Sequence, residues 1–427
     1  MKKRDPYYSE GMGRGSEDPV LLTKVIFLSF LFDIKGDDNI INTLAQRLDW
    51  LQFCDLSIGD PLFDRTTLVK FRRALGPMLI ATLFVDLLER LRNVSLVKEE
   101  HCFFDGTPVK ATARINMYRD EIYKDPLAVI NHRLCQLSTR QLSLNFDQNP
   151  SPVQLKQDSY PVDNQLLEAR RNQEMKPVAE RRSAGDPEAQ FQRTKHGKTG
   201  ELGYEIFFSS DAQQLFIVDV DLSAQPSQGQ SIFKKKLEQS QPGQTWSVDG
   251  EFTTGELLSV AEEKQVTLNT PPRPLTNKGF FPKTEFSYDE AVNTYTCPGD
   301  QILSQISQNK KSGDRIYRAA AGKCDGCPLK PKCTASKTGR SVNRSKYEEA
   351  LNRNRKRAQS QEAVMGRILR GIVAEGKFAE AVRHGIKIVR YFGLEMAKMQ
   401  ATLVALILNM KRYLRIMDEL EPYQRLV

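Results

Sequence analysis

The sequence predicts a mixed α/β fold that follows a helical domain. Apolar residues recur at helical spacing near both ends of the 427-residue chain, over 19–95 and 344–417. Between these two parts lie short apolar runs of the kind that form strands, and long polar stretches separate them. We therefore expect an interrupted α/β body between a helical head and a helical tail.

Helical signals define the head. In PMLIATLFVDLLERLRN (77–93), Pro77 is placed to open a helix whose apolar residues recur at helical spacing. A shorter helix is expected just before it, with Thr66 or Thr67 as the N-cap and several basic residues along its length. These signals predict an all-helical module over 19–95.

Four apolar runs predict the strands of the α/β body. HCFFD and TWSVD end in Asp105 and Asp249, and a glycine follows each aspartate, which predicts a strand running into a turn. The runs at 203–210 and 214–222 are separated by three turn residues and predict a hairpin. An amphipathic helix is expected after Asp249, with apolar residues at positions 257, 258, 260 and 261.

Charge and composition limit the classes of function. The chain has 62 Lys and Arg against 53 Asp and Glu, and the net charge of +9 favours a polyanionic partner such as nucleic acid. The most apolar windows, 20–32 and 401–408, are shorter than the roughly 20 residues of a membrane helix, and no signal peptide is evident. Seven cysteines suit a reducing compartment. We expect a soluble, cytoplasmic protein.

Asp105 and Asp249 are the catalytic candidates that the pattern itself supplies. A carboxylate at the end of a buried strand projects into the crevice beyond the sheet, a usual place for active sites in α/β folds. Two such carboxylates on adjacent strands would supply the oxygen ligands that Mg²⁺ takes. Two ions can serve the attacking and the leaving oxygen of phosphodiester chemistry. Asp-Gly is also common in turns, so a turn role stays open for each residue.

The cysteines late in the chain form a candidate metal site. Cys324, Cys327 and Cys333 are spaced as C-x2-C-x5-C, and Cys297 could supply a fourth thiolate. One structural Zn²⁺ bound there would stabilise the segment 270–343, in which the sequence shows no convincing long helix. Free thiols in a loop are the alternative.

Three blocks of the sequence resemble the catalytic blocks of bacterial insertion-sequence DDE transposases. They are FFDGTPVKA, SVDGEFTTGELLSVAEEKQV and EGKFAEAVRHGIKIVRYFGLEMAKMQATLVALILNMKRYL, and SAGDPEAQF and CDGCPLKPKCT also resemble segments of that group. The resemblance covers roughly 19–425. It implies an RNase H-like mixed sheet with flanking helices, in which Asp105, Asp249 and Glu375 are catalytic and hold two Mg²⁺ or Mn²⁺ ions. Taken alone, Glu375 is a solvated carboxylate on a helix.

One position departs from the family pattern. The family usually has lysine seven residues after the catalytic glutamate, and this chain has Val382 there. The DNA contact that the lysine implies would then fall to Arg383 or Lys377. Asp186, in the DPEAQF segment, is expected to cap or shape a turn and is assigned no chemistry.

Two basic clusters are candidate DNA contacts, although a solvated face is the plainer interpretation of either. The first would make groove contacts from a helix-turn-helix-like head, and the second would neutralise phosphates without regard to sequence. The clusters are Arg65, Lys70, Arg72 and Arg73, and Arg353, Arg355, Lys356 and Arg357.

The domain organisation follows from these signals and the resemblance. The predicted parts are a flexible arm (1–18), a helical DNA-binding domain (19–95), the first part of an RNase H-like catalytic domain (96–269, with a polar insertion at 144–190), a Cys-rich insertion (270–343) and the helical last part of the catalytic domain (344–427).

The resemblance implies a DNA transposase that cleaves element ends and joins them to target double-stranded DNA as a homodimer or larger assembly, without a membrane, in association with the bacterial nucleoid. Two alternatives remain: an RNase H-like metal-dependent nuclease, and an inactive derivative that only binds DNA.

Overall fold

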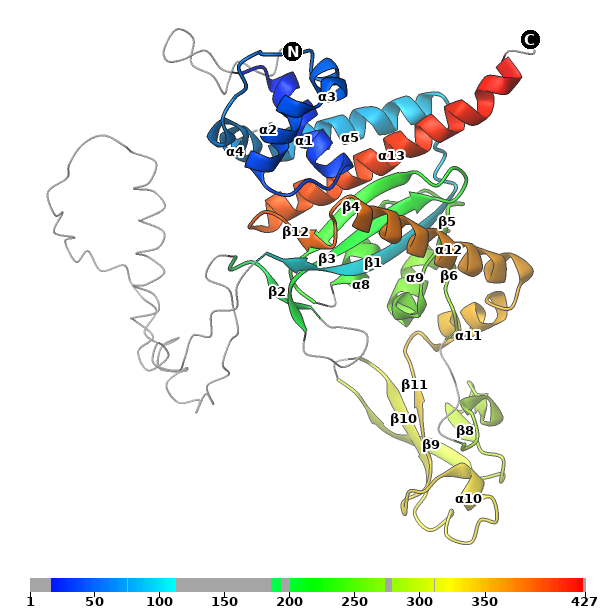
Figure 1. Cartoon of the computed structure of the whole chain (residues 1–427). Helices are drawn as coiled ribbons and strands as arrows, with labels where there is room; N and C mark the ends of the chain where they lie inside the picture. Colours follow the sequence, from blue (N-terminus) through cyan, green and yellow to red (C-terminus); the bar gives the residue numbers. More distant parts are fainter. Residues whose placement is uncertain are drawn as a thin grey trace, which may run out of the picture.

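The structure is a computed structural model that describes residues 17–74, 76–112, 186–192, 200–226, 228–272, 279–310 and 312–424. Within these ranges a mixed sheet carries helices on both faces, and a second, smaller sheet extends away from it (Figure 1). Most of the predicted arm (1–18) and of the predicted polar insertion (144–190) lies outside the described residues.

The head contains the helices that the periodicity predicts. Asp18 caps the first helix by accepting a 3.0 Å hydrogen bond from the Val20 amide. Asp64 caps the fourth, because its carboxylate accepts from the amides of Thr66 and Thr67, so the prediction of a threonine cap is wrong. The predicted helix over 77–93 is confirmed. The head helices are α1 (Pro19–Leu31), α2 (Asp37–Gln46), α3 (Leu48–Phe53), α4 (Arg65–Ala74) and α5 (Gly76–Asn93).

The larger sheet combines antiparallel and parallel pairing. β3 pairs antiparallel with β1 and β4, which confirms the predicted hairpin, whereas β5 pairs parallel with β1 and β6 pairs parallel with β5. This order of strands and directions is consistent with the predicted RNase H-like fold class. The strands are β1 (His101–Ala111), β2 (Gln190–Gln192), β3 (Glu201–Asp211), β4 (Ile217–Ser223), β5 (Thr245–Ser247), β6 (Thr267–Asn269) and the short β12 (Ile388–Val389).

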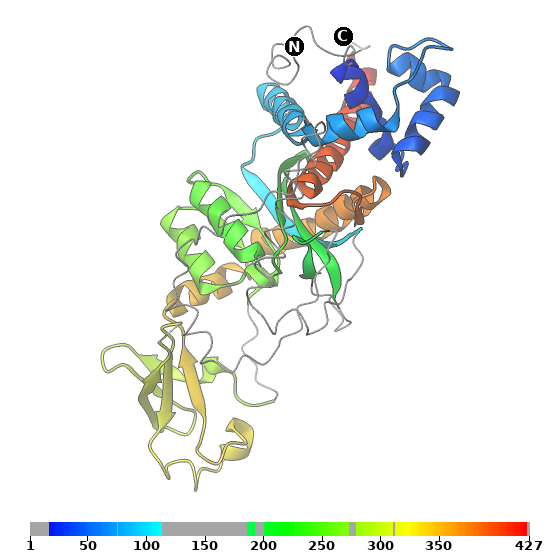
Figure 2. The ribbon, with the colours of Figure 1, turned by 90° about the vertical axis from the view of Figure 1, so that its left-hand side faces the viewer.

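Helices cover both faces of this sheet (Figure 2). On one face Phe104 and Phe207 pack with Phe233 of α8 and Leu257 of α9, the helix predicted after Asp249. The other face packs under α12 and α13, and the same apolar cluster continues into the head. The helices are α8 (Gly229–Gln239), α9 (Gly255–Glu263), α11 (Glu348–Arg357), α12 (Gln361–Arg383) and α13 (Leu394–Gln424).

The Cys-rich segment forms a separate antiparallel sheet, which the sequence did not predict. Its strands follow the order β11-β10-β9-β8-β7, and Tyr295, Leu303 and Tyr317 are central to its small core. The elements are η4 (Lys283–Glu285), β7 (Ser287–Asp289), β8 (Thr294–Thr296), β9 (Ile302–Gln308), β10 (Arg315–Ala319), α10 (Lys330–Cys333) and β11 (Ser341–Arg344).

Among the helices of the described residues, none is long and apolar enough to cross a membrane.

Candidate active site

Asp105 and Asp249 lie at the same level of two adjacent parallel strands. The last residues of β1 and β5 that pair in register are Phe103 and Ser247. Asp105 follows Phe103 by two residues and lies within β1, and Asp249 follows Ser247, the last residue of β5, by two residues. The strand pairing therefore places the backbones of these two aspartates, which the sequence pattern singled out, at neighbouring positions of the sheet.

The two Asp-Gly pairs have different local structures. At Asp105 the predicted turn is wrong, because β1 continues without interruption to Ala111. Gly106 is needed there for space: a Cβ at this position would lie 2.5 Å from a ring carbon of Phe207 on the neighbouring strand. At Asp249 the turn is confirmed, since its side chain caps the 3₁₀ turn η3 (Gly250–Phe252) and accepts a 2.9 Å hydrogen bond from the Glu251 amide.

Buried hydroxyl groups fix the loop that carries Asp249. The Thr270 hydroxyl donates a 3.0 Å hydrogen bond to the main-chain oxygen of Asp249. Thr270 also pairs with the hydroxyl of Thr253, and both threonines are fully buried. A buried hydroxyl is costly unless it is hydrogen-bonded, so this network holds the loop in one conformation.

α12 lies across the face of the sheet that presents Asp105. Gly366 allows the close approach, because a Cβ there would come within 2.8 Å of the Ser247 hydroxyl oxygen. One turn later, Arg370 forms an ion pair with Asp105 at 3.4 Å, and the side chains are 19% and 23% exposed. The Asp105 carboxylate therefore has a cationic neighbour in this conformation.

Glu375, the third predicted catalytic residue, is exposed on α12, five residues beyond Arg370. Among the described residues, no three His, Cys, Asp or Glu side chains are grouped so that they could hold a metal ion. Within the described residues, the three carboxylates predicted to act together, those of Asp105, Asp249 and Glu375, are therefore not grouped as a metal site.

Glu205 on β3 is an acidic residue near Asp249 that the sequence analysis missed. Burial raises the pKa of Glu205 to about 7, and the negative charges of Glu251 and Asp249 contribute to the increase. Its sequence context, GYEIFF, indicates only a strand, and the neighbours that perturb it come from a distant part of the chain. No local signal could have identified it.

Arg72 does not occupy the position that a DNA groove contact requires. It is 6% exposed, donates to both oxygens of Asp37 at 2.7 and 3.0 Å, and lies 4.2 Å from the centre of the Tyr391 ring. The prediction of a groove contact is wrong for this residue, because its helix face packs inward. Lys70 and Arg73 are exposed on the same helix, and Arg65 is ion-paired with Asp38 at 3.1 Å.

The basic run on α11 mostly holds that helix in place. Arg353 forms a bidentate pair with Glu262 of α9 at 2.9 and 2.6 Å. Arg357 donates to the Leu268 carbonyl oxygen at 2.8 Å, and burial lowers its pKa. Arg355 lies 3.7 Å from Glu348, whereas Lys356 is exposed.

Arg383 and Lys377, the two residues predicted to replace the lysine at position 382, differ in environment. Arg383 is exposed at the end of α12. Burial lowers the pKa of Lys377 to about 8. Arg383 is therefore the more accessible of the two to a polyanion.

Asp186 has a larger structural role than the predicted turn. It is 1% exposed and accepts hydrogen bonds from the Tyr204 hydroxyl at 2.7 and 2.8 Å. Two residues later, Glu188 accepts a 2.6 Å hydrogen bond from the Leu394 amide at the start of α13. The DPEAQF segment thus ties β3 to the last helix.

Cys297, Cys324, Cys327 and Cys333 line one cavity of about 30 Å³ in the smaller sheet domain. This volume is room for about one water-sized species. A Cβ on Gly299 would lie 3.3 Å from the Cys327 sulfur and 3.9 Å from that of Cys297, so the backbone at Gly299 packs closely against these two thiols. All four are free thiols, and within the described part of the chain they are not grouped closely enough to hold a metal ion.

Two family models of transposases match parts of this chain. One described as "Transposase DDE domain" matches residues 296–414, and one described as "Transposase domain (DUF772)" matches residues 1–74. Over these two ranges the chain is therefore similar to transposases, in agreement with the resemblance of its sequence blocks, and the matches support DNA transposase function.

Similarity to individual proteins is weak. No curated protein gives a significant match. A solved structure of a piggyBac transposase synaptic complex with hairpin DNA is 10% identical, with 97% of this chain and 77% of that chain covered and a TM-score of 0.28. A TM-score of this size does not support a structural argument.

Proposed function

We propose that the protein cleaves phosphodiester bonds at the ends of a mobile element and joins the freed 3′ ends to target DNA. The alignment of Asp105 with Asp249 on parallel strands carries this proposal, in a chain whose first and last parts match transposase models. Water would attack a phosphodiester at the element end, and the released 3′-hydroxyl would then attack target DNA. In each step one P–O bond forms as another breaks, with no covalent enzyme intermediate.

The catalytic contribution of the chain in this proposal is positioning and charge neutralisation. Asp105, Asp249 and Glu375 would hold two Mg²⁺ or Mn²⁺ ions, whose oxygen preference fits three carboxylates. When bound, two such ions stabilise the attacking and the leaving oxygen. Loading them requires the Arg370 guanidinium to leave Asp105 and the Glu375 carboxylate to approach the two aspartates.

Double-stranded DNA, both the element ends and the target, is the proposed partner. The net charge of +9 and the exposed side chains of Lys70, Arg73, Lys356 and Arg383 favour binding to phosphates. We propose a homodimer or larger assembly on paired ends, by resemblance to the family. The four cysteines are proposed to bind one structural zinc, because all four line the same small cavity.

The first experiment measures Mg²⁺- or Mn²⁺-dependent cleavage of DNA carrying the sequences that flank this gene. Asp249→Asn and Glu375→Gln are expected to abolish cleavage while DNA binding persists, since each removes one carboxylate charge without changing side-chain size. Asp86→Asn and Glu89→Gln are matched controls, because both residues are exposed on α5, and they should cleave like the wild type.

The outcomes separate the alternatives. Cleavage that survives Glu375→Gln would remove that residue from the triad. Cleavage without joining of the 3′ ends to a target plasmid would favour the nuclease. A wild type that binds element ends tightly but never cleaves would favour the inactive DNA-binding derivative.

A further inference from the structure

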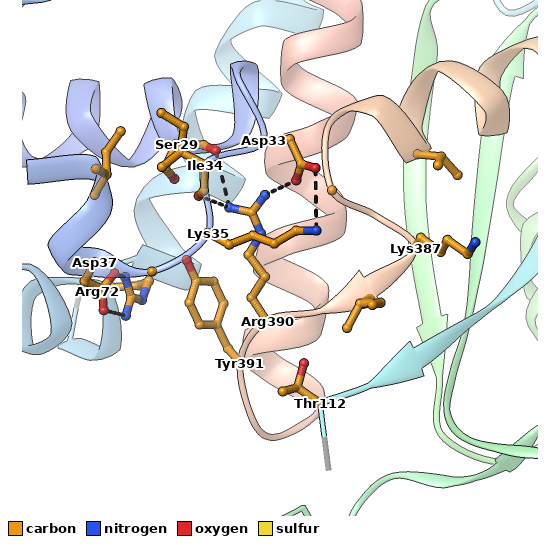
Figure 3. A pocket seen from close by; sticks show the side chains of 15 residues that line it. Ser29, Asp33, Ile34, Lys35, Asp37, Arg72, Thr112, Lys387, Arg390 and Tyr391 are labelled. Atoms are coloured by element: carbon orange, nitrogen blue, oxygen red, sulfur yellow. Dashed lines mark hydrogen bonds and ion pairs between the residues drawn. The ribbon is translucent and has the colours of Figure 1, made fainter. Parts of the chain in front are cut away.

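A charged cavity lies where the head meets the segment around Arg390. Asp105 and Asp249 are not among the residues that line it. Its volume is about 540 Å³, within the range of pockets that hold small ligands. One wall comes from the end of α1, the start of α2 and the last turn of α4, and the other from the end of α12 and the segment that follows it, up to Tyr391 (Figure 3). Thr112, directly after β1, closes it on a third side.

Two arginines build the interior of this cavity. The Arg390 side chain is 12% exposed and donates to Asp33 at 2.5 Å and to the Ile34 carbonyl oxygen at 2.9 Å. Arg72 pairs with Asp37 on the head side (Figure 3). Because each aspartate is already paired with an arginine, the acidic charge in the cavity is neutralised from within.

The backbone is shaped around this arrangement. Gly385 has φ of +81°, and a Cβ there would lie 2.4 Å from an Arg390 guanidinium nitrogen and 2.7 Å from an Asp33 oxygen. Only glycine fits this conformation and this spacing without strain. The Nε of Arg390 is buried and has no hydrogen-bond partner among the described residues, so one donor of the site is still unsatisfied.

The surplus charge of the cavity is positive. The charged side chains that line it include four cations, Arg72, Arg390, Lys35 and Lys387, and two anions, Asp33 and Asp37. Both lysines are exposed. The Lys35 side chain is 69% exposed and lies 3.8 Å from Asp33. Two exposed lysines beside internally paired arginines suit a singly charged anion that approaches from solvent, such as a phosphodiester.

We propose that this cavity, which we name the junction site, binds a backbone phosphate of the element-end DNA. The inference rests on the proposed function for its ligand and assigns to Lys35 and Lys387 the contact with phosphate oxygens. Arg390 and Arg72 are positioning residues that hold the two walls together.

The strand that connects the two sites sets their spacing. Thr112 follows Asp105 by seven residues along the direction of β1, which at ~3.3 Å per residue is about 23 Å. With ~3.4 Å between successive nucleotides of one strand, this length corresponds to about seven nucleotides. For a duplex whose axis runs along β1, the contacted phosphate would lie about seven nucleotides from the bond that is cleaved.

The test measures binding without chemistry. A fluorescein-labelled duplex with the sequence that flanks the gene is titrated in EDTA, by anisotropy, across a range of KCl concentrations. Lys35→Gln combined with Lys387→Gln should weaken binding at least tenfold near 0.1 M salt. It should also flatten the slope of log K against log salt by about 0.9 for each phosphate that is no longer neutralised. The exposed pair Lys98→Gln and Lys264→Gln is the matched control.

A second measurement locates the contact. Duplexes that carry one neutral methylphosphonate at successive positions are compared for the wild type and the double variant. A substitution about seven nucleotides from the cleaved bond should weaken only the wild type. The proposal is overturned if the double variant binds like the control pair, or if no position distinguishes it from the wild type.

The result is separable from the test of the proposed function. If the two lysines prove not to contact DNA, the cleavage assay and the expected loss of cleavage in Asp249→Asn are unaffected. Conversely, if the wild type binds DNA through the two lysines but never cleaves it, the junction site is supported and the proposed transposase activity is rejected.

Discussion

The head and the Cys-rich sheet domain differ in how they are joined to the rest of the protein. The head shares one continuous apolar cluster with α13 and the larger sheet, in which Phe30, Leu88 and Leu403 are all buried. The Cys-rich domain has its own small core around Tyr317 and extends away from the body (Figure 1). One region is part of the main core, and the other is nearly self-contained.

Polar contacts repeat the same contrast. Asn409 of α13 is fully buried and pairs with both backbone groups of Ile217 at 2.8 Å, which fixes the helix against β4. Arg390 and His384, late in the chain, bond to main-chain oxygens at the end of α1. The head therefore packs as an integral part of the α/β body, although its sequence looks like a separate module.

The largest expected effect is on the Cys-rich domain alone. Chelation of a bound zinc with 1,10-phenanthroline should remove hydrogen-exchange protection from 287–344 while the core around α13 stays protected, because a structural zinc site contributes roughly 10 kcal/mol to a small domain. Elemental analysis should find about one zinc ion per chain. Cys327→Ser should lose the zinc, whereas Cys54→Ser, in the head core, should keep it.

Two observations would contradict the zinc site. One is purified protein without zinc that nevertheless shows full protection of the smaller sheet. The other is zinc content that stays the same in Cys327→Ser.

The next largest effect tests the unity of the head and the body. Leu403→Ala, at a fully buried position of α13, should cost about 3 kcal/mol and lower the stability of head and larger sheet together. Leu414→Ala on the same helix is the matched control, since Leu414 is 58% exposed and its side chain packs little. Hydrogen exchange, resolved by segment, checks both variants. Destabilisation confined to α13, with α1–α5 unchanged, would mean that the head is an independent unit after all.

Sequence reasoning succeeded where the signal is local. Helical periodicity placed α5, and two apolar runs around turn residues placed the β3–β4 hairpin. The two Asp-Gly pairs show its limit: the same dipeptide lies inside a strand at Asp105 and caps a turn at Asp249. At Asp105 the strand continues because β1 pairs with β3, which lies about a hundred residues further along the chain.

The other errors have related causes. β9, ILSQISQ, is exposed at most positions, so it has no apolar face from which a strand could be predicted. Arg72 belongs to a basic cluster in sequence but is buried in space, because Asp37 and Tyr391 lie against it. The role of a charged residue depends on its partners, and those partners come from distant segments.

The smallest expected effect is a pH dependence of the contact between the head and the last block. The Nδ1 of His384 faces the carbonyl oxygens of Phe30 and Leu31 at 3.2 and 3.0 Å, so this nitrogen must carry the proton and donate. The Nε2 then accepts from Lys411 at 3.1 Å, which requires a neutral ring. Burial and the Lys411 ammonium group accordingly lower the pKa of His384.

A lowered pKa of a base gives the sign of the effect. Above the unfolded-state pKa of ~6.5 the ring is neutral in both states, and the stabilisation is complete. As the pH falls below that value, the unfolded chain takes up a proton that the folded chain resists. The free energy of unfolding should therefore drop by about 1 kcal/mol per pH unit.

His384→Asn keeps a donor for the carbonyl oxygens and removes the titrating group. Urea unfolding between pH 7 and 5.5 should show a shallower loss of stability in this variant than in the wild type. His101, which burial also protects from protonation, stays in both proteins and supplies the shared background. Equal pH slopes for wild type and variant would show that His384 does not report on this contact. A smaller slope would show that the head's attachment to the last block is itself sensitive to acid.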